Sequence, residues 1–340
     1  MMKIQKKTNL VAALVLVLFV AGVCYIKVYK SPNSKIGRKM EKMFCKASPT
    51  WSYPPTPPER TINFPENKAV GLLYTATGAH SYSYDSHWEE MYGPAKGEVK
   101  LAEGTAVCLE IKEGFSSILS KLEPNSIQAI DFSAPFDLPF ELYTNNQTKR
   151  IVQLSDEDLE AIKNLNGLYQ LVLHNTTITD KALTYISGLK SLRLINLWNT
   201  KITNDGLSYL AQLPFLDTIF LGATDISDEG LKHLSKLTRL RCLWLTKSNR
   251  KKGNEIATAG SVNLKITDAG MHHLGALTSL EYLSASDTDI TDKSVNILSQ
   301  LSSLRRLDVS GTKITEEGIR KLQAALPDCR IINNARITGR

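Results

Sequence analysis

The sequence has few of the features that mark enzymes or disulfide-stabilised proteins. Its five cysteines are scattered along 340 residues without a C-x-x-C pair, so neither a zinc site nor a dense disulfide framework is indicated. A single bridge, such as one between Cys45 and Cys108, stays open. A Gly-rich phosphate loop, a nucleophile elbow and an H-E-x-x-H motif are all lacking. We therefore expect no catalytic site, no cofactor and no small-molecule substrate.

One group of metal-capable side chains falls within residues 80–90. It consists of His80, Asp85, His87, Glu89 and Glu90. Their spacing matches no known ligand frame, and the glycine, serine and tyrosine residues between them are typical of an irregular loop. We expect no metal here.

The positive charge of the chain is concentrated at one end. The net charge is +7, but residues 1–46 hold ten basic residues and one acid, a net +9, so residues 47–340 carry 7 − 9 = −2. A nucleic-acid-binding protein spreads its basic residues over a folded face. The charge distribution therefore predicts no nucleic-acid partner.

A long apolar run occurs only near the N-terminus. It extends from Leu10 to Ile26, follows three lysines and precedes further basic residues. As a helix at ~1.5 Å per residue it would span roughly 26 Å, close to the hydrocarbon core of a bilayer. We expect residues 1–30 to form an uncleaved transmembrane helix, with the body of the protein outside the cytoplasm. The alternatives are a signal peptide cleaved after Gly22 and a lipoprotein modified at Cys24.

A 24-residue repeat is the most specific signal in the chain. Residues 168–189 contain an L-x-x-L-x-L stretch, a T-x-I-T-D step and three further apolar residues at a spacing of three. The pattern returns at residues 192, 216, 280 and 304. The unit that begins at residue 240 reaches its Ile-Thr step 40 residues after the preceding one, which indicates an insertion of 16 residues within 247–263.

Each unit predicts a short strand followed by a short helix. The L-x-x-L-x-L stretch alternates with period two, so its leucines face a core. A threonine stands where each helix needs an N-cap, and the acid that often follows suits the positive end of the helix dipole. A small residue three places after the cap indicates close packing between turns. No unit can bury its own apolar face, so stacking supplies the core.

These motifs resemble the leucine-rich-repeat family, in its bacterial 24-residue variety, over residues 150–330. The resemblance implies an α/β horseshoe with a parallel concave sheet and short convex helices. It also implies an interaction scaffold without catalytic residues. We expect residues 31–60 to be a basic, proline-rich linker, residues 61–125 a small β-rich cap, and residues 126–340 the repeat domain.

The repeat places one set of side chains on the concave face, opposite the leucines. Three aromatic residues fall on neighbouring strands there, and we expect them to be an exposed patch that binds a partner. The alternatives are that another part of the chain covers them, or that the predicted strand register is wrong. The candidate binding residues are Val172, His174, Leu194, Asn196, Trp198, Phe220, Trp244 and Tyr282.

The insertion adds a basic rim beside this patch. It carries Lys247, Arg250, Lys251 and Lys252, which would suit an anionic protein or an acidic glycan; a solvated charged loop is the other interpretation. Two classes of function remain. One is a membrane-tethered module that binds a protein partner on its concave face, and the other is a self-associating structural protein of the bacterial envelope.

Overall fold

The computed structural model describes residues 15–20, 23–28, 57–67, 69–77, 90–111, 116–132, 154–247 and 264–333. The chain divides into two units, residues 1–46 and residues 47–340. In the first unit, strands β1 (Val15–Val20) and β2 (Val23–Val28) pair antiparallel, with Val20 opposite Val23. They stand where the sequence predicts a transmembrane helix, and that helix is not seen. Their many β-branched residues favour a strand over a helix.

The described residues contain no helix that is both long and apolar enough to cross a membrane. The predicted membrane anchor is therefore not shown. It stays a proposal that rests on the sequence alone.

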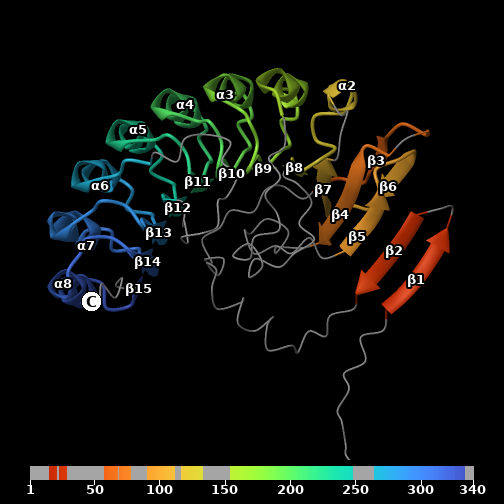
Figure 1. The fold of residues 1–340 in the computed structure, drawn as a ribbon. Coiled ribbons are helices and arrows are strands. Elements are labelled where there is room, and N and C mark those ends of the chain that lie inside the picture. The colour runs from red at the N-terminus through yellow and green to blue at the C-terminus, as the bar shows by residue number, and fades with distance from the viewer. Residues whose placement is uncertain are drawn as a thin grey trace, which may run out of the picture. The chain divides into compact units, whose positions relative to one another are not determined.

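The second unit is built on one curved sheet (Figure 1). In its described part the sheet has eleven strands in the order β15-β14-β13-β12-β11-β10-β9-β8-β7-β4-β5. Strands β7 (Thr105–Ile111) to β15 (Arg330–Ile332) are parallel. Strands β4 (Gly71–Thr77) and β5 (Glu90–Pro94) add to the β7 edge as antiparallel strands. The predicted cap therefore continues the sheet of the repeats.

A smaller sheet completes the cap. Strands β3 (Arg60–Asn63) and β6 (Glu98–Leu101) pair antiparallel, and Arg60 is held by the carbonyl oxygens of Thr105 and Ser126 and by the side-chain oxygen of Gln128. Cys108 on β7 is a free, buried thiol. Cys45, the other half of the bridge that the sequence leaves open, lies outside the described residues.

Each repeat adds one strand to the concave side and one short helix to the convex side (Figure 1). The remaining strands of the sheet are β8 (Ala129–Asp131), β9 (Gln170–Val172), β10 (Leu194–Asn196), β11 (Thr218–Phe220), β12 (Cys242–Trp244), β13 (Tyr282–Ser284) and β14 (Arg306–Asp308). The helices are α2 (Ser116–Leu119), η3 (Asp156–Ile162), α3 (Asp180–Ile186), α4 (Asn204–Leu210), α5 (Asp228–Leu234), α6 (Asp268–Leu274), η4 (Asp292–Ser294), α7 (Val295–Ser299) and α8 (Glu316–Ala325).

The leucines of the repeat form the core between the strands and the helices. The middle residues of successive strands, for example Leu171, Ile195 and Ile219, are fully buried and stand side by side in the register of the sheet. The predicted strand register is therefore confirmed. The 24-residue period works because each turn of the solenoid buries the aliphatic face of the turn before it.

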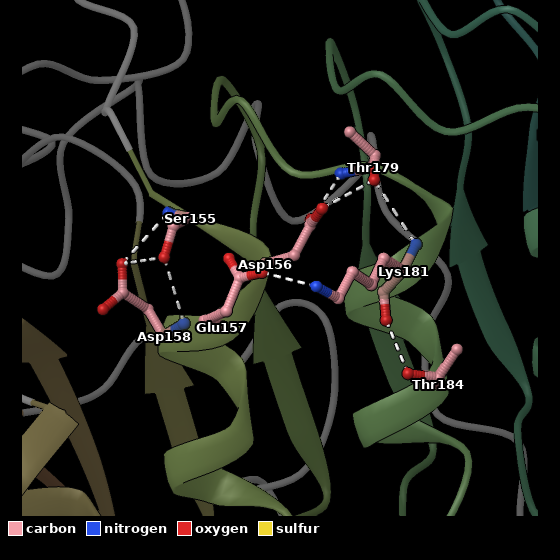
Figure 2. Close-up of polar contacts among 7 residues, drawn as sticks. All are labelled: Ser155, Asp156, Glu157, Asp158, Thr179, Lys181 and Thr184. Carbon is pink, nitrogen blue, oxygen red and sulfur yellow. Dashed lines mark hydrogen bonds and ion pairs between the residues drawn. The ribbon is translucent and has the colours of Figure 1, made fainter.

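A ladder of side-chain hydrogen bonds joins the start of each helix to the next. Oδ1 of Asp156 accepts from the backbone N–H of Thr179 at 2.7 Å, and Oδ2 accepts from the Thr179 hydroxyl at 2.6 Å (Figure 2). The same pairing joins Asp180 to Thr203, Asp228 to Thr267, Asp268 to Thr291 and Asp292 to Thr315. Asn204 and Ser227 form the remaining rung, in which Asn204 Oδ1 accepts and Asn204 Nδ2 donates.

This ladder explains the small residue after each cap. A Cβ atom at Gly206, Gly230, Gly270 or Gly318 would collide with the side-chain oxygen of the preceding rung. Ser294 occupies the equivalent position and instead donates its hydroxyl to Asp268 Oδ1 at 2.5 Å. The T-x-I-T-D-x-G step is therefore a unit that both caps a helix and binds the next repeat.

Candidate functional site

The strand register places the predicted binding residues on the concave side of the sheet. Asn196 stands beside Val172 and Phe220, and Phe220 stands beside Trp244. All of these alternate with the buried middle residues of their strands. The interpretation that the register is wrong is therefore excluded.

A row of stacked rings crosses three neighbouring strands on this side. The Phe220 and Trp244 rings are 5.4 Å apart at an angle of 39°, and the Trp244 and Tyr282 rings stack at 4.9 Å and 18°. The guanidinium of Arg306 lies 5.4 Å from the centre of the Tyr282 ring and extends the row to β14. The spacing of strands in a sheet, ~4.8 Å, matches the spacing of stacked rings.

The rings of this row expose less surface than the sequence suggests. Phe220 and Tyr282 are each only 2% exposed, whereas Trp198 and Trp244 are half-buried. The expectation of a broad exposed patch is therefore wrong for Phe220 and Tyr282. The period of the repeat fixes which face a side chain occupies, but it does not report how much its neighbours cover it.

Trp198 is held in place from two sides. Its backbone N–H donates to Asn196 Oδ1 at 3.0 Å, which fixes the turn that leaves β10. Its ring lies over Gly222 on the next repeat, so closely that a Cβ atom there would clash with the indole. Trp198 is therefore a half-buried ring with a fixed orientation beside the stacked row.

The other predicted concave residues are more enclosed. Val172 and Leu194 are buried, and His174 is 6% exposed. Burial lowers the pKa of His174 to about 4, so this side chain is neutral at physiological pH. His174 therefore contributes an uncharged ring to the concave side.

The predicted basic rim is described only at its start. Lys247 Nζ lies 3.6 Å from Asp289 Oδ2, across the base of the insertion. Arg250, Lys251 and Lys252 lie outside the described residues, as do the metal-capable residues from His80 to Glu89. Among the described residues, no three His, Cys, Asp or Glu side chains gather closely enough to hold a metal ion.

Sequence reasoning missed a buried group of hydroxyls beside Trp244. Thr246 Oγ1 lies 2.9 Å from Ser284 Oγ and accepts from Ser286 Oγ at 3.0 Å. These residues belong to the same concave columns as the aromatics, so the repeat register could have found them. They form a polar, self-satisfied surface next to the rings.

A second missed feature is a row of charged residues, one just before each of strands β10 to β14. The row is Arg193, Asp217, Arg241, Glu281 and Arg305. Arg241 Nη2 pairs with Glu281 Oε1 at 2.6 Å, and both side chains are mostly buried, at 16% and 12% exposed. The alternation of signs at the repeat period is the sequence signal that marks this edge.

Asp217 lies between Arg193 and Arg241 in that row and is 6% exposed. Burial raises the pKa of Asp217 to about 6, although the Thr218 hydroxyl and the guanidiniums of Arg193, Arg241 and Arg239 act in the opposite direction. The Thr218 hydroxyl donates to its Oδ1 at 2.9 Å. This edge therefore changes its charge near neutral pH.

Comparison with known proteins gives one family match and several similar structures. A family model described as a leucine-rich repeat matches residues 300–322, which form one repeat. Among solved structures, internalin C2 of Listeria monocytogenes is similar with a TM-score of 0.39 and 25% identity, over 55% of this chain and 78% of that chain. Internalin F of the same species is similar with a TM-score of 0.37 and 18% identity, over 68% and 67%. No curated protein matches the sequence.

Proposed function

We propose that this leucine-rich-repeat protein is a non-catalytic binding module that holds a protein partner against its concave side. The observation that carries the proposal is the row of Phe220, Trp244, Tyr282 and Arg306, with Trp198 fixed beside it. Aromatic rings and arginine are the side chains that most often dominate binding energy at protein interfaces. A rigid row loses little conformational entropy on binding, which favours affinity.

The exposed parts of this row define a small contact. Trp198 and Trp244 are half-buried and offer an edge or a face to a partner, whereas Phe220 and Tyr282 support them from within. The hydroxyls of Thr246, Ser284 and Ser286 are buried beside the rings and satisfy one another, so they leave no unpaired polar group under the contact. The proposed contact is thus a small aromatic centre.

We further propose that residues 10–26 tether the module to a membrane, with residues 47–340 outside the cytoplasm. The support is the apolar run and its basic flanks, which are found in the sequence. The test is carbonate extraction of membranes that contain the full-length chain. Retention in the pellet supports the tether, whereas release into the supernatant contradicts an integral anchor.

The concave site is tested with the full-length chain as bait on membranes of the source organism. Partners identified by mass spectrometry are then measured against the purified bait. The variant Trp198→Ala/Trp244→Ala is expected to bind a concave partner at least about 100-fold more weakly, because two interface tryptophans are removed. Tyr92→Ala is the matched control, since it removes an exposed aromatic residue from strand β5 of the cap, away from the concave aromatics.

The outcomes separate the two classes of function. A partner that the unchanged chain and Tyr92→Ala retain, and the double variant loses, supports the concave module. Equal retention by all three chains contradicts the concave site. Recovery of only further copies of the chain favours the self-associating structural role instead.

A further inference from the structure

The edge of the solenoid at the start of the strands carries a second, exposed cluster. Phe215 lies in the turn before β11 and is 42% exposed, one of two large apolar side chains in the described residues with such exposure. The guanidinium of Arg193 lies 5.7 Å from the centre of its ring, and that of Arg239 lies 5.4 Å from it. We call Arg193, Phe215 and Arg239 the edge cluster.

The cluster joins three successive repeats. Arg193 precedes β10, Phe215 precedes β11 and Arg239 precedes β12. Lys190 reinforces the junction, because its Nζ donates to the carbonyl oxygens of Ser187 and of Gln212 in the next repeat, at 2.8 and 3.1 Å. The cluster therefore has a fixed shape set by the stacking of the solenoid.

Among the described residues neither guanidinium of the cluster forms an ion pair within 4 Å, although both act on the nearby, buried Asp217 carboxyl. Arg193 Nε is buried and has no hydrogen-bond acceptor. Arg241, one repeat further along the same row, shows the contrast, because it donates two hydrogen bonds to Glu281. Arg193 and Arg239 are thus cations on an exposed aromatic ring with donor capacity left over.

We propose that the edge cluster is a docking site for an acidic segment of a protein partner, separate from the concave site. Separate carboxylates of the segment pair with the Arg193 and Arg239 guanidiniums, and an apolar side chain between them packs on Phe215. Arginine and carboxylate pair through planar, charge-assisted hydrogen bonds, which suits this geometry. An exposed ring between two cations contributes apolar contact and keeps the guanidiniums oriented.

The edge favours a protein over an anionic membrane surface. The row that contains Arg193 alternates in sign through Asp217 and Glu281, so a uniformly negative surface would bring lipid phosphates against buried acids. A peptide can place its charges in register with single arginines. Membrane binding is therefore the competing outcome of the test.

The test measures binding of a fluorescein-labelled hexapeptide of alternating glutamate and leucine to the full-length chain by fluorescence anisotropy at low salt. A hexapeptide with glutamine in place of glutamate is the ligand control. Arg193→Gln/Arg239→Gln and Phe215→Ala are each expected to weaken binding by at least about tenfold. Arg320→Gln is the matched protein control, because Arg320 is an exposed arginine on convex helix α8, paired with Glu317.

Three results would overturn the proposal. The first is that Arg320→Gln weakens binding of the peptide as much as the cluster variants do. That result would mean that the overall charge of the protein, and not the cluster, binds the peptide. The second is that Trp198→Ala/Trp244→Ala loses binding of the peptide while the variants of the edge cluster keep it. That result would place the acidic ligand in the concave site. The third is no binding of the peptide, together with binding to phosphatidylserine vesicles that Arg193→Gln/Arg239→Gln weakens. If the double arginine variant does not fold, Arg239→Gln alone provides the test, because Arg239 is exposed.

Discussion

The indole ring of Trp198 lies over the α-carbon of Gly222, its counterpart in the next repeat. Every other described residue at this place in the repeat, such as His174, Thr246 and Ser286, carries a side chain. Glycine is needed at this one point because the neighbouring residue is the largest in the column. The two residues therefore belong together, because Gly222 leaves the space in which the Trp198 ring lies.

Replacement of Gly222 by alanine tests this relationship. The added methyl group must displace the indole, so we expect the free energy of unfolding to fall by about 1–3 kcal/mol. Gly188→Ala is the control, because a Cβ atom there meets no other atom and stability should change little or rise slightly. Urea denaturation measures both. An unchanged midpoint for Gly222→Ala would show that the ring is not confined by this contact.

The ladder between repeats predicts a large effect at Asp268, which accepts hydrogen bonds from Thr291 N–H, Thr291 Oγ1 and Ser294 Oγ. Asp268→Ala leaves these donors without their acceptor, and we expect a loss of about 2–3 kcal/mol. Asp225→Ala removes an exposed aspartate outside the ladder and should change stability by less than about 0.5 kcal/mol. Equal losses in the two variants would contradict a role for the rung.

The same rung predicts a pH dependence. Burial acts to raise the pKa of Asp268, but the hydrogen bonds from Ser294 and Thr291 outweigh it, and the pKa lies below its ordinary value of 3.8. Because the folded state holds the ionised form more strongly, this contribution is complete above pH 3.8 and is lost as the pH falls through the lowered pKa. The stability difference between the unchanged chain and Asp268→Ala should therefore narrow in acid.

Gly270 offers a more selective test of the ladder. A Cβ atom there collides with Asp228 Oδ1, yet serine at the equivalent position 294 donates to Asp268. We expect the free energy of unfolding of Gly270→Ser to stay within about 1 kcal/mol of that of the unchanged chain, because the serine hydroxyl reproduces that hydrogen bond. Gly270→Val, which adds bulk without a donor, should cost about 1–3 kcal/mol. Thermal denaturation of both variants decides the point, and equal costs would contradict it.

Asp217 predicts an opposite dependence on pH. Its pKa is raised from 3.8 to about 6 by burial, so the folded state favours the protonated form. The stability that this group contributes is fully present below pH 3.8 and is lost as the pH rises through 6. At neutral pH the ionised side chain therefore lowers the free energy of unfolding by something on the order of 3 kcal/mol. Asp217→Asn should therefore be more stable than the unchanged chain at pH 7.5, and equal to it near pH 4. Thermal melts across this range measure the difference, and a constant offset would contradict the shift.

Much of the repeat domain follows from the sequence, because its leucines recur where a buried strand needs them. Thr179 is an N-cap as its position predicts, and its hydroxyl accepts from the Lys181 N–H at 3.4 Å. The acid beside each cap was expected only to complement the helix dipole. The structure adds its main role, since Asp156 binds the Thr179 of the next repeat. That pairing joins residues 23 apart and needs the stacking distance, which the sequence does not state.

The site was less predictable than the fold. Periodicity predicts that Phe220 and Tyr282 lie on the concave side, but it does not predict that each is only 2% exposed there. The sequence did not predict the edge cluster, because Arg193 and Phe215 occupy different positions of the repeat and come together only across two units. At the N-terminus, hydrophobicity alone predicted a helix over residues 10–26, whereas Val15–Val28 contains two strands.

The ladder also bears on the order in which the chain acquires its structure. Most rungs join residues 23 apart, so each can form soon after the next cap leaves the ribosome, and folding can spread from the N-terminal cap one repeat at a time. The rung from Asp228 to Thr267 spans 39 residues across the insertion. Closing the longer loop costs more entropy. Folding that proceeds from the N-terminus should therefore pause at the boundary between α5 and α6. At that stage the first repeats are complete, and the last repeats have no folded surface on which to stack.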